Sequence, residues 1–121
     1  MELEIDKDLV AASATPLVLA ILAGGESYGY AILKRVRELS DGEMEWTDGM
    51  LYPLLHRLHR LGYVTREWRI SQGGRRRRYY AITEDGHTAL NSHRRQWTAV
   101  ARALDDAWGE AGTPPLAFGR T

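Results

Sequence analysis

Five leucines between positions 51 and 61 recur at the spacing of one face of an α-helix. They stand at i, i+3, i+4, i+7 and i+10, so a helix would gather Leu51, Leu54, Leu55, Leu58 and Leu61 into one apolar stripe. The residues that fall on the opposite face are small, hydrogen-bonding or cationic. The spacing therefore predicts a helix that buries its leucines and presents a polar face outward.

An arginine-rich segment follows this predicted helix. Between His56 and Tyr80 the chain carries eight arginines, including the run Arg75 to Arg78, against the single acid Glu67. The formal net charge of the whole chain is nevertheless zero, because the acids gather in other segments. This local separation of charge, next to a helix with a polar outer face, predicts double-stranded DNA as a partner.

The N-terminal part of the chain has the pattern of two further helices. The first is expected from about Ile5 to Ala23, where Pro16 either kinks the helix or begins a new one with Thr15 as its N-cap. Ser27 is expected to cap a second helix that ends at residues 40–42. Three helices, including the leucine-striped one, are thus expected before residue 63.

A β-hairpin is expected after the third helix. Residues 63–71 and 76–83 alternate and are rich in β-forming side chains, and the glycine-containing link 71–74 joins them. Thr47 or Asp48 is expected to cap the third helix, and Gly62 stands where a C-terminal glycine belongs. The order of elements is that of a winged helix-turn-helix, a mainly α fold of the α+β class with a small hairpin.

A long final helix is expected from the cap Thr83 to about Trp108. Its apolar positions follow a heptad spacing and comprise Leu90, Trp97, Val100, Leu104 and Ala107. Such a seam requires a partner, so we expect a homodimer with two recognition helices related by a two-fold axis. The expected organisation is a DNA-binding domain over residues 1–82, a dimerisation helix over 83–108 and a flexible tail over 109–121.

Composition narrows the remaining classes of function. The 121-residue chain has no cysteine, so it has neither disulfides nor thiolate sites. His56 and His59 are spaced as two metal ligands would be, but no third ligand is near them in sequence, and no metal or cofactor is expected. No catalytic motif is present, so an enzyme is not expected. The longest apolar run is too short to span a bilayer, which favours a cytoplasmic protein that does not bind membranes.

The candidate DNA contacts follow from the predicted elements. The hydroxyl of Tyr52 can reach a phosphate, Gly49 permits close backbone approach, and Met50 offers apolar contact to a thymine methyl. Because side chains alternate along a strand, Arg75 and Arg77 face away from Arg76 and Arg78. The full set of expected DNA contacts is Tyr28, Thr47, Gly49, Met50, Tyr52, Pro53, His56, Arg60, Arg75, Arg76, Arg77 and Arg78.

The order of elements and several short segments resemble the PadR family of bacterial transcriptional regulators. These segments are 27–32, 49–53, 58–62, 73–76, 79–80 and 83–86, and the resemblance covers roughly residues 5 to 108. The length of the final helix and the strings at 41–45 and 71–75 are similar to the short-armed, multidrug-sensing branch of that family. The resemblance implies a homodimeric repressor that binds a pseudo-palindromic operator and releases it when a flat hydrophobic compound binds.

In that branch the resemblance implies a ligand pore at the dimer interface, with a tryptophan from each final helix stacked on the compound. Trp97 stands at this position, and the candidate ligand-binding residues are Leu9, Ala12, Pro16, Arg94, Trp97 and Ala101. Ala101 replaces an acid that would suit cationic drugs, and Arg94 replaces an aromatic residue. If Arg94 points inward, a neutral or anionic aromatic compound is favoured over a cation.

Two other functions fit the same sequence. The chain could bind DNA as a winged-helix protein without any small-molecule effector, its final helix serving only assembly. It could also use the winged fold as a protein-interaction module that does not bind DNA.

Overall fold

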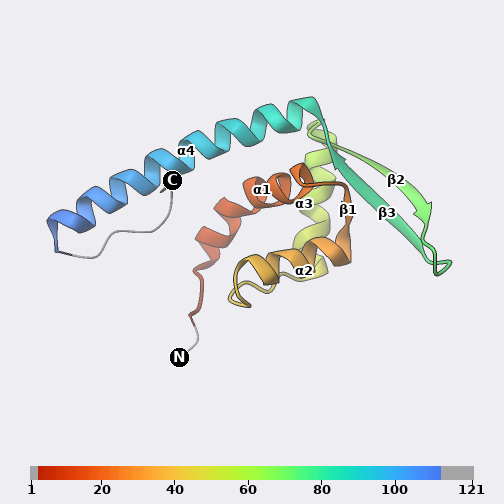
Figure 1. Ribbon diagram of the computed structural model, residues 1–121, viewed down its shortest axis with the longest axis horizontal. Helices are drawn as coiled ribbons and strands as arrows, with labels where there is room; N and C mark the ends of the chain where they lie inside the picture. The colour runs from red at the N-terminus through yellow and green to blue at the C-terminus, as the bar shows by residue number, and fades with distance from the viewer. Residues whose placement is uncertain (1–2, 113–121) are drawn as a thin grey trace.

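The computed structural model describes residues 3–112, within which the chain forms four helices and a small three-stranded sheet (Figure 1). The elements in chain order are α1 (Lys7–Ala23), β1 (Ser27–Tyr28), α2 (Gly29–Leu39), α3 (Asp48–Arg60), β2 (Val64–Ile70), β3 (Arg76–Ile82) and α4 (Glu84–Glu110). This is the expected α+β winged helix-turn-helix with a long C-terminal helix.

The first helix, α1, is continuous through Pro16. Its N-cap is Asp6, whose carboxylate accepts a hydrogen bond from the N–H of Asp8 at 2.8 Å. A new helix capped by Thr15 is therefore wrong, and the Thr15 hydroxyl instead accepts a hydrogen bond from Arg57 of α3 at 3.2 Å. Pro16 removes one helical hydrogen bond. The side chains of Ala14 before it and of Val18 and Leu19 after it are buried, and this burial stabilises the helix on both sides of the proline.

The second expected helix begins later than the sequence indicated. Ser27 is not its cap, because Ser27 and Tyr28 form the short strand β1, which pairs antiparallel with Tyr79 and Tyr80 of β3. The wing is therefore part of a three-stranded sheet with the order β1-β3-β2, not a two-stranded hairpin. The N-cap of α2 is Tyr28, which makes no side-chain cap hydrogen bond, so the first N–H groups of α2 lack a side-chain acceptor.

The third helix, α3, has the expected cap and the expected buried stripe. The Thr47 hydroxyl accepts from the N–H of Met50 at 3.3 Å, and four of the five stripe leucines are buried. Leu61 is the exception at 52% exposed, so its assignment to the buried stripe is wrong. The helix ends at Arg60, and Gly62, with a φ of +82°, reverses the chain and turns Leu61 outward.

The core lies where α1, α2 and α3 meet the base of the sheet. Its fully or almost fully buried members are Val18, Leu19, Leu22, Ile32, Val36, Leu51, Leu55, Leu58, Val64 and Tyr80. These side chains come from α1, α2 and α3 and from the strands β2 and β3, so burying them together fixes α3 relative to the hairpin.

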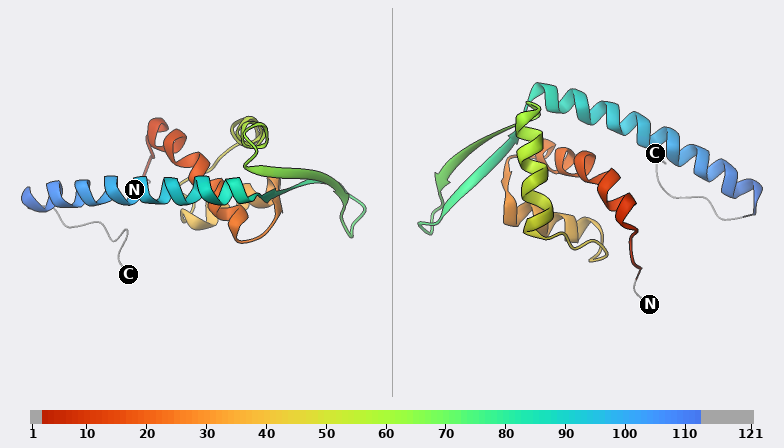
Figure 2. Two further views of the ribbon diagram at one scale, coloured as in Figure 1. Left: turned by 90° about the horizontal axis from the view of Figure 1, so that it is seen from above. Right: turned by 180° about the vertical axis from the view of Figure 1, so that it is seen from behind.

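The hairpin of β2 and β3 projects from the domain on the side opposite to the far end of α4 (Figures 1 and 2). Its register places Trp68 opposite Arg78 and Ile70 opposite Arg76. Gly74, with a φ of +79°, allows the turn in which its N–H donates to the carbonyl of Ser71 at 2.9 Å. Because β1 has only two residues, residues 76–78 of β3 have no strand partner on the β1 side.

The last helix, α4, begins at the expected cap, where the Thr83 hydroxyl accepts from the N–H of Gly86 at 3.0 Å. It continues two residues beyond Trp108, so Gly109 and Glu110 are helical and the tail expected from residue 109 begins too early. The remainder of that expected tail, residues 113–121, lies outside the described residues. None of the helices between residues 3 and 112 combines the length and apolar character needed to cross a bilayer.

Candidate nucleic-acid interface

The outward face of α3 carries the residues that the sequence assigned to it. Gly49, Tyr52, Pro53, His56 and Arg60 are all exposed, whereas the leucines between them are buried. Gly49 has open space around its Cα, with Thr47 Oγ1 at 3.8 Å from a Cβ built there as the nearest atom. A duplex can therefore approach the start of α3 closely.

Met50, unlike the exposed residues of α3 named above, points partly into the domain. Its side chain is half-buried, packs against the core and lines a separate hollow beside Trp46 and the N-terminal segment. A Met50 that packs inward has less of its side chain to offer to a base than the exposed Gly49 beside it.

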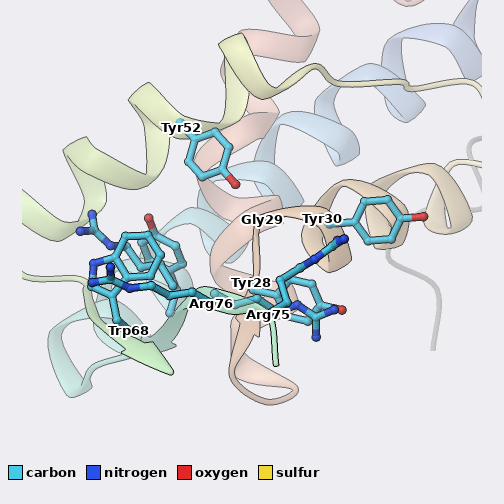
Figure 3. A pocket seen from close by; sticks show the side chains of 10 residues that line it. Tyr28, Gly29, Tyr30, Tyr52, Trp68, Arg75 and Arg76 are labelled. Carbon is cyan, nitrogen blue, oxygen red and sulfur yellow. The ribbon is translucent and has the colours of Figure 1, made fainter. Parts of the chain in front are cut away.

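A groove of about 830 Å³ lies between α3, the β1–α2 junction and the wing (Figure 3). It brings together six of the residues expected to contact DNA, and its lining comprises Tyr28, Gly29, Tyr30, Tyr52, Trp68, Arg75, Arg76, Arg77, Arg78 and Tyr80. Four cationic side chains and no carboxylate line it. Such a surface favours a polyanion with flat or hydrogen-bonding groups.

Tyr52 crosses this groove from α3 toward the β1–α2 junction (Figure 3). A Cβ built on Gly29 would lie 2.2 Å from the Tyr52 hydroxyl oxygen, so the phenol can occupy this place only because residue 29 is glycine. Burial, with smaller contributions from Asp48 and Tyr80, raises the pKa of Tyr52, so the phenol stays protonated and can donate to a phosphate oxygen. The first turn of α2, whose N–H groups lack a side-chain cap, lies directly beside it.

The wing arginines are held against aromatic rings on both faces of the sheet. The guanidinium carbons of Arg76 and Arg78 lie 4.5 Å and 4.6 Å from the centre of the Trp68 ring. On the other face, Arg77 lies 4.3 Å from the centre of Tyr28, which itself makes an edge contact with Tyr79 at 5.4 Å. Stacking restricts each guanidinium and leaves its charge unneutralised.

Arg69 is an exception among these arginines. It forms ion pairs with Glu26 and Glu67, including hydrogen bonds of 2.8 Å from its Nη2 to Glu26 and from its Nε to Glu67. The hydrogen bond from Arg69 is the main cause that lowers the pKa of Glu26, and the two carboxylates raise the pKa of Arg69. Arg69 therefore links the start of the sheet to the wing and has little free charge for a phosphate.

The C-terminal half of α3 carries a smaller basic cluster. The pKa of His59 is lowered by burial and then by the positive charges of Arg66, His56 and Arg78. A phosphate placed among these groups would offset that repulsion and favour the protonated imidazole.

The groove also contains two exposed aromatic residues that the sequence analysis did not name as DNA contacts. Tyr30 is 67% exposed in the first turn of α2, and Trp68 is half exposed on β2. Trp68 lies in β2 on the same face as the buried Val64, but unlike Val64 it stands beyond the core. The place of Tyr30 beside the groove depends on the strand β1, which the sequence analysis did not predict.

The candidate ligand residues lie along α1 and α4, which pack against each other. Trp97 and Pro16 are half-buried, Leu9 and Ala12 are exposed, and Arg94 is exposed, whereas Ala101 is 7% exposed and so covered within one chain. Three further apolar side chains of α4 are exposed, namely Val100 (52%), Leu104 (40%) and Trp108 (37%).

A family model described as the transcriptional regulator PadR-like family matches residues 18–92 of the chain. The chain belongs to the PadR-like family of transcriptional regulators. The match runs from α1 into α4 and includes every residue that lines the groove. PadR-like proteins regulate transcription and bind DNA, so the groove lies in a member of a DNA-binding family.

Related proteins agree with this assignment. A transcriptional regulator from Mycobacterium tuberculosis is 41% identical over 68 residues, which are 56% of this chain and 63% of that protein. The solved structure of a transcriptional regulator from Clostridium thermocellum has a TM-score of 0.75 and 26% identity, covering 83% of this chain and 97% of that one. A PadR family transcriptional regulator from Eggerthella lenta has a TM-score of 0.66 and 32% identity, covering 83% and 81%. The chain thus spans less than two thirds of its M. tuberculosis relative.

Proposed function

We propose that this PadR-like chain represses transcription as a homodimer that holds α3 in the major groove of a pseudo-palindromic operator. The observation that carries the proposal is the acid-free groove between α3 and the wing, lined by the run Arg75 to Arg78. The DNA contacts proposed are those expected from the sequence, with Tyr30 and Trp68 added. Tyr52 and the first turn of α2 would anchor one phosphate and so fix the register of α3 on the duplex.

The dimer is proposed from α4. Its 27 residues correspond to about 40 Å of helix, longer than α1 can cover, and the apolar side chains beyond α1 are exposed. A second copy packed on Val100, Leu104 and Trp108 would bury this face and set two α3 helices side by side. Residues 1–82 would then be the DNA-binding domain, and residues 83–108 the dimerisation arm.

We propose further that planar aromatic compounds bind between the two arms and release the operator. The residues proposed to contact them are Leu9, Ala12, Pro16, Arg94, Trp97 and Ala101. Trp97 supports this because its indole is half-buried on the apolar face of α4, where both the covered Ala101 and the exposed Val100 follow it within about one turn. A compound that prefers one crossing of the arms would shift the population toward a spacing of α3 helices that does not match the operator.

The DNA-binding part is tested by fluorescence anisotropy with labelled duplex from the region upstream of the gene, at low salt. Retention of this duplex at nanomolar to micromolar protein is expected, and no retention of any duplex would contradict the proposal. Sedimentation equilibrium on the same protein is expected to give a dimer.

The effector part is tested separately by quenching of tryptophan fluorescence with a panel of planar neutral, anionic and cationic aromatics. Trp97→Ala is expected to abolish the quenching that accompanies operator release. Trp46→Phe is the matched control, because Trp46 is a buried core residue beside Met50 and the N-terminal segment and is not among the proposed ligand residues. Quenching that survives Trp97→Ala would count against the site between the arms.

A further inference from the structure

The outward face of α3 carries one residue of each of the two types least suited to a helix interior. Gly49 and Pro53 are both exposed, and their spacing of four residues places them on the same face. Pro53 has no N–H, so it cannot donate the helical hydrogen bond to the carbonyl oxygen of Gly49. The outward face of α3 therefore holds a main-chain acceptor that lacks its helical donor.

Packing within the chain does not account for either residue. A Cβ built on Gly49 would have only Thr47 Oγ1, at 3.8 Å, close to it, and Gly49 does not have the positive φ that favours glycine at other turns of this chain. Pro53 is exposed and lies outside the core formed by residues 3–112. Both residues make α3 less stable than alanine would, so a role toward a partner explains them better than the fold does.

Together the two residues make the Gly49 carbonyl accessible from outside. The ring of a helical proline collides with the carbonyl four residues earlier and opens the helix on the side of the proline. Gly49 has no side chain that would stand between its carbonyl and a partner. In the unbound protein water can satisfy this oxygen, because Gly49 is exposed. A duplex that displaces the water must supply a donor in its place.

The donors in the major groove are the amino groups of adenine and cytosine, whereas guanine and thymine present carbonyl acceptors there. The first residues of a recognition helix are those that approach base edges, and Gly49 is in the first turn of α3. We infer that the Gly49 carbonyl, freed by Pro53, selects an amino base at one position of each half-site and rejects the two keto bases. This inference rests on the proposed DNA-binding function and adds a main-chain reader to its side-chain contacts.

The test uses the full-length protein and the tightest duplex obtained by in vitro selection. Each position of a half-site is changed through the four base pairs, and the affinities are measured by fluorescence anisotropy. At one position, wild-type protein is expected to bind adenine or cytosine on a given strand about 5- to 150-fold more tightly than guanine or thymine. Replacing that adenine by unsubstituted purine, which lacks the amino group, is expected to cost a similar factor. A half-site without such a position would overturn the inference.

Pro53→Ala assigns the preference to the freed carbonyl. The new N–H can donate to Gly49, so this variant is expected to retain duplex but to favour amino over keto bases by less than about threefold. Thermal unfolding is expected at or above the wild-type midpoint, because α3 gains a hydrogen bond and a better helix former. Pro16→Ala makes the same change inside α1 and, as the matched control, is expected to keep the preference. A folded Pro53→Ala protein with the wild-type preference would refute the role of the carbonyl.

Two neighbouring variants separate the carbonyl from other sources of the same preference. Gly49→Ala is expected to bind the amino-base duplex at least about fivefold more weakly without loss of stability, because its methyl group meets open space within the chain but stands in the way of the bases. The carboxylate of Asp48 can also accept from cytosine, and Asp48→Ala is expected to keep the preference. Loss of the preference in Asp48→Ala but not in Pro53→Ala would contradict the inference. A wild-type protein that retains no duplex at all would instead contradict the proposed function.

Discussion

Replacing Gly29 by alanine is expected to weaken DNA binding without lowering the stability of the fold. The new Cβ would lie 2.2 Å from the hydroxyl oxygen of Tyr52, and ordinary contact begins near 3.4 Å, so the end of the phenol must move by about 1.2 Å. A shift of this size exceeds the range of about 0.5 Å over which an O–H···O hydrogen bond keeps its strength. The proposed bond from Tyr52 to a phosphate would therefore be lost.

A hydrogen bond to a charged group contributes about 1.5–3 kcal/mol, which corresponds to about a 10- to 150-fold loss of affinity for duplex. The free energy of unfolding should not fall together with the affinity for duplex. Tyr52 is 45% exposed and can rotate outward, and alanine is a better helix former than glycine by up to about 1 kcal/mol. Thermal unfolding of Gly29→Ala is thus expected at or slightly above the wild-type midpoint.

Anisotropy titrations of Gly29→Ala, Tyr52→Phe and the double variant complete this test. Both single variants are expected to lose similar affinity, and the double variant is expected to lose no more than either, since all three remove the same bond. A folded Gly29→Ala protein whose affinity is within twofold of wild type would refute the reasoning, because Tyr52 would then have no phosphate to lose.

Three further outcomes follow from the same structure. Gly86→Ala should lower the midpoint of thermal unfolding, because its Cβ would lie 2.2 Å from the backbone carbonyl oxygen of Tyr63, which cannot rotate away; an unchanged midpoint would contradict this. Arg69→Gln should leave the salt dependence of duplex binding unchanged, since Glu26 and Glu67 already neutralise this guanidinium. A slope smaller in magnitude by about one would show that Arg69 binds a phosphate. The pKa of His59 is lowered in the folded protein, so the unfolded chain binds the imidazole proton more readily. The contribution of His59 to the free energy of unfolding is therefore present above about pH 6.5 and is lost as the pH falls toward the folded pKa. His59→Gln should flatten the pH dependence of stability in this range, as urea titrations at several pH values would show.

The sequence predicted those parts of the fold that local spacing determines. The leucine stripe of α3, its Thr47 cap and the Thr83 cap of α4 each depend on residues within a turn or two, and all are present. Leu61 was assigned to the stripe by spacing alone. The chain reverses at Gly62 immediately after it, so the helical spacing no longer determines where Leu61 points.

The errors come from contacts between distant segments. Ser27 reads as a helix cap because its type suits that position, but its strand forms only by pairing with Tyr80, more than fifty residues later. Gly29 carries no sequence signal for its role, since the atom that excludes a side chain there belongs to Tyr52 of another helix. Pairing and close approach of this kind are tertiary effects that override local preference.

The neutralisation of Arg69 has the same origin. In sequence Arg69 is one of eight equivalent arginines, and only the fold brings Glu26 within 2.8 Å of it. The sequence thus named six of the residues that line the groove, whereas the distinction between free and paired cations required the structure.

The central claim, that the groove between α3 and the wing binds the DNA backbone, is tested most directly by the salt dependence of duplex binding. The logarithm of the association constant is expected to fall linearly with the logarithm of salt concentration, with a slope of about −0.9 for each phosphate contacted. Changing Arg75 to Arg78 together to glutamine should reduce the magnitude of that slope by about one for each arginine that binds a phosphate, while the exposed Arg35→Gln on α2 should leave it unchanged. A four-glutamine protein that binds the same duplex with the wild-type slope would contradict the account.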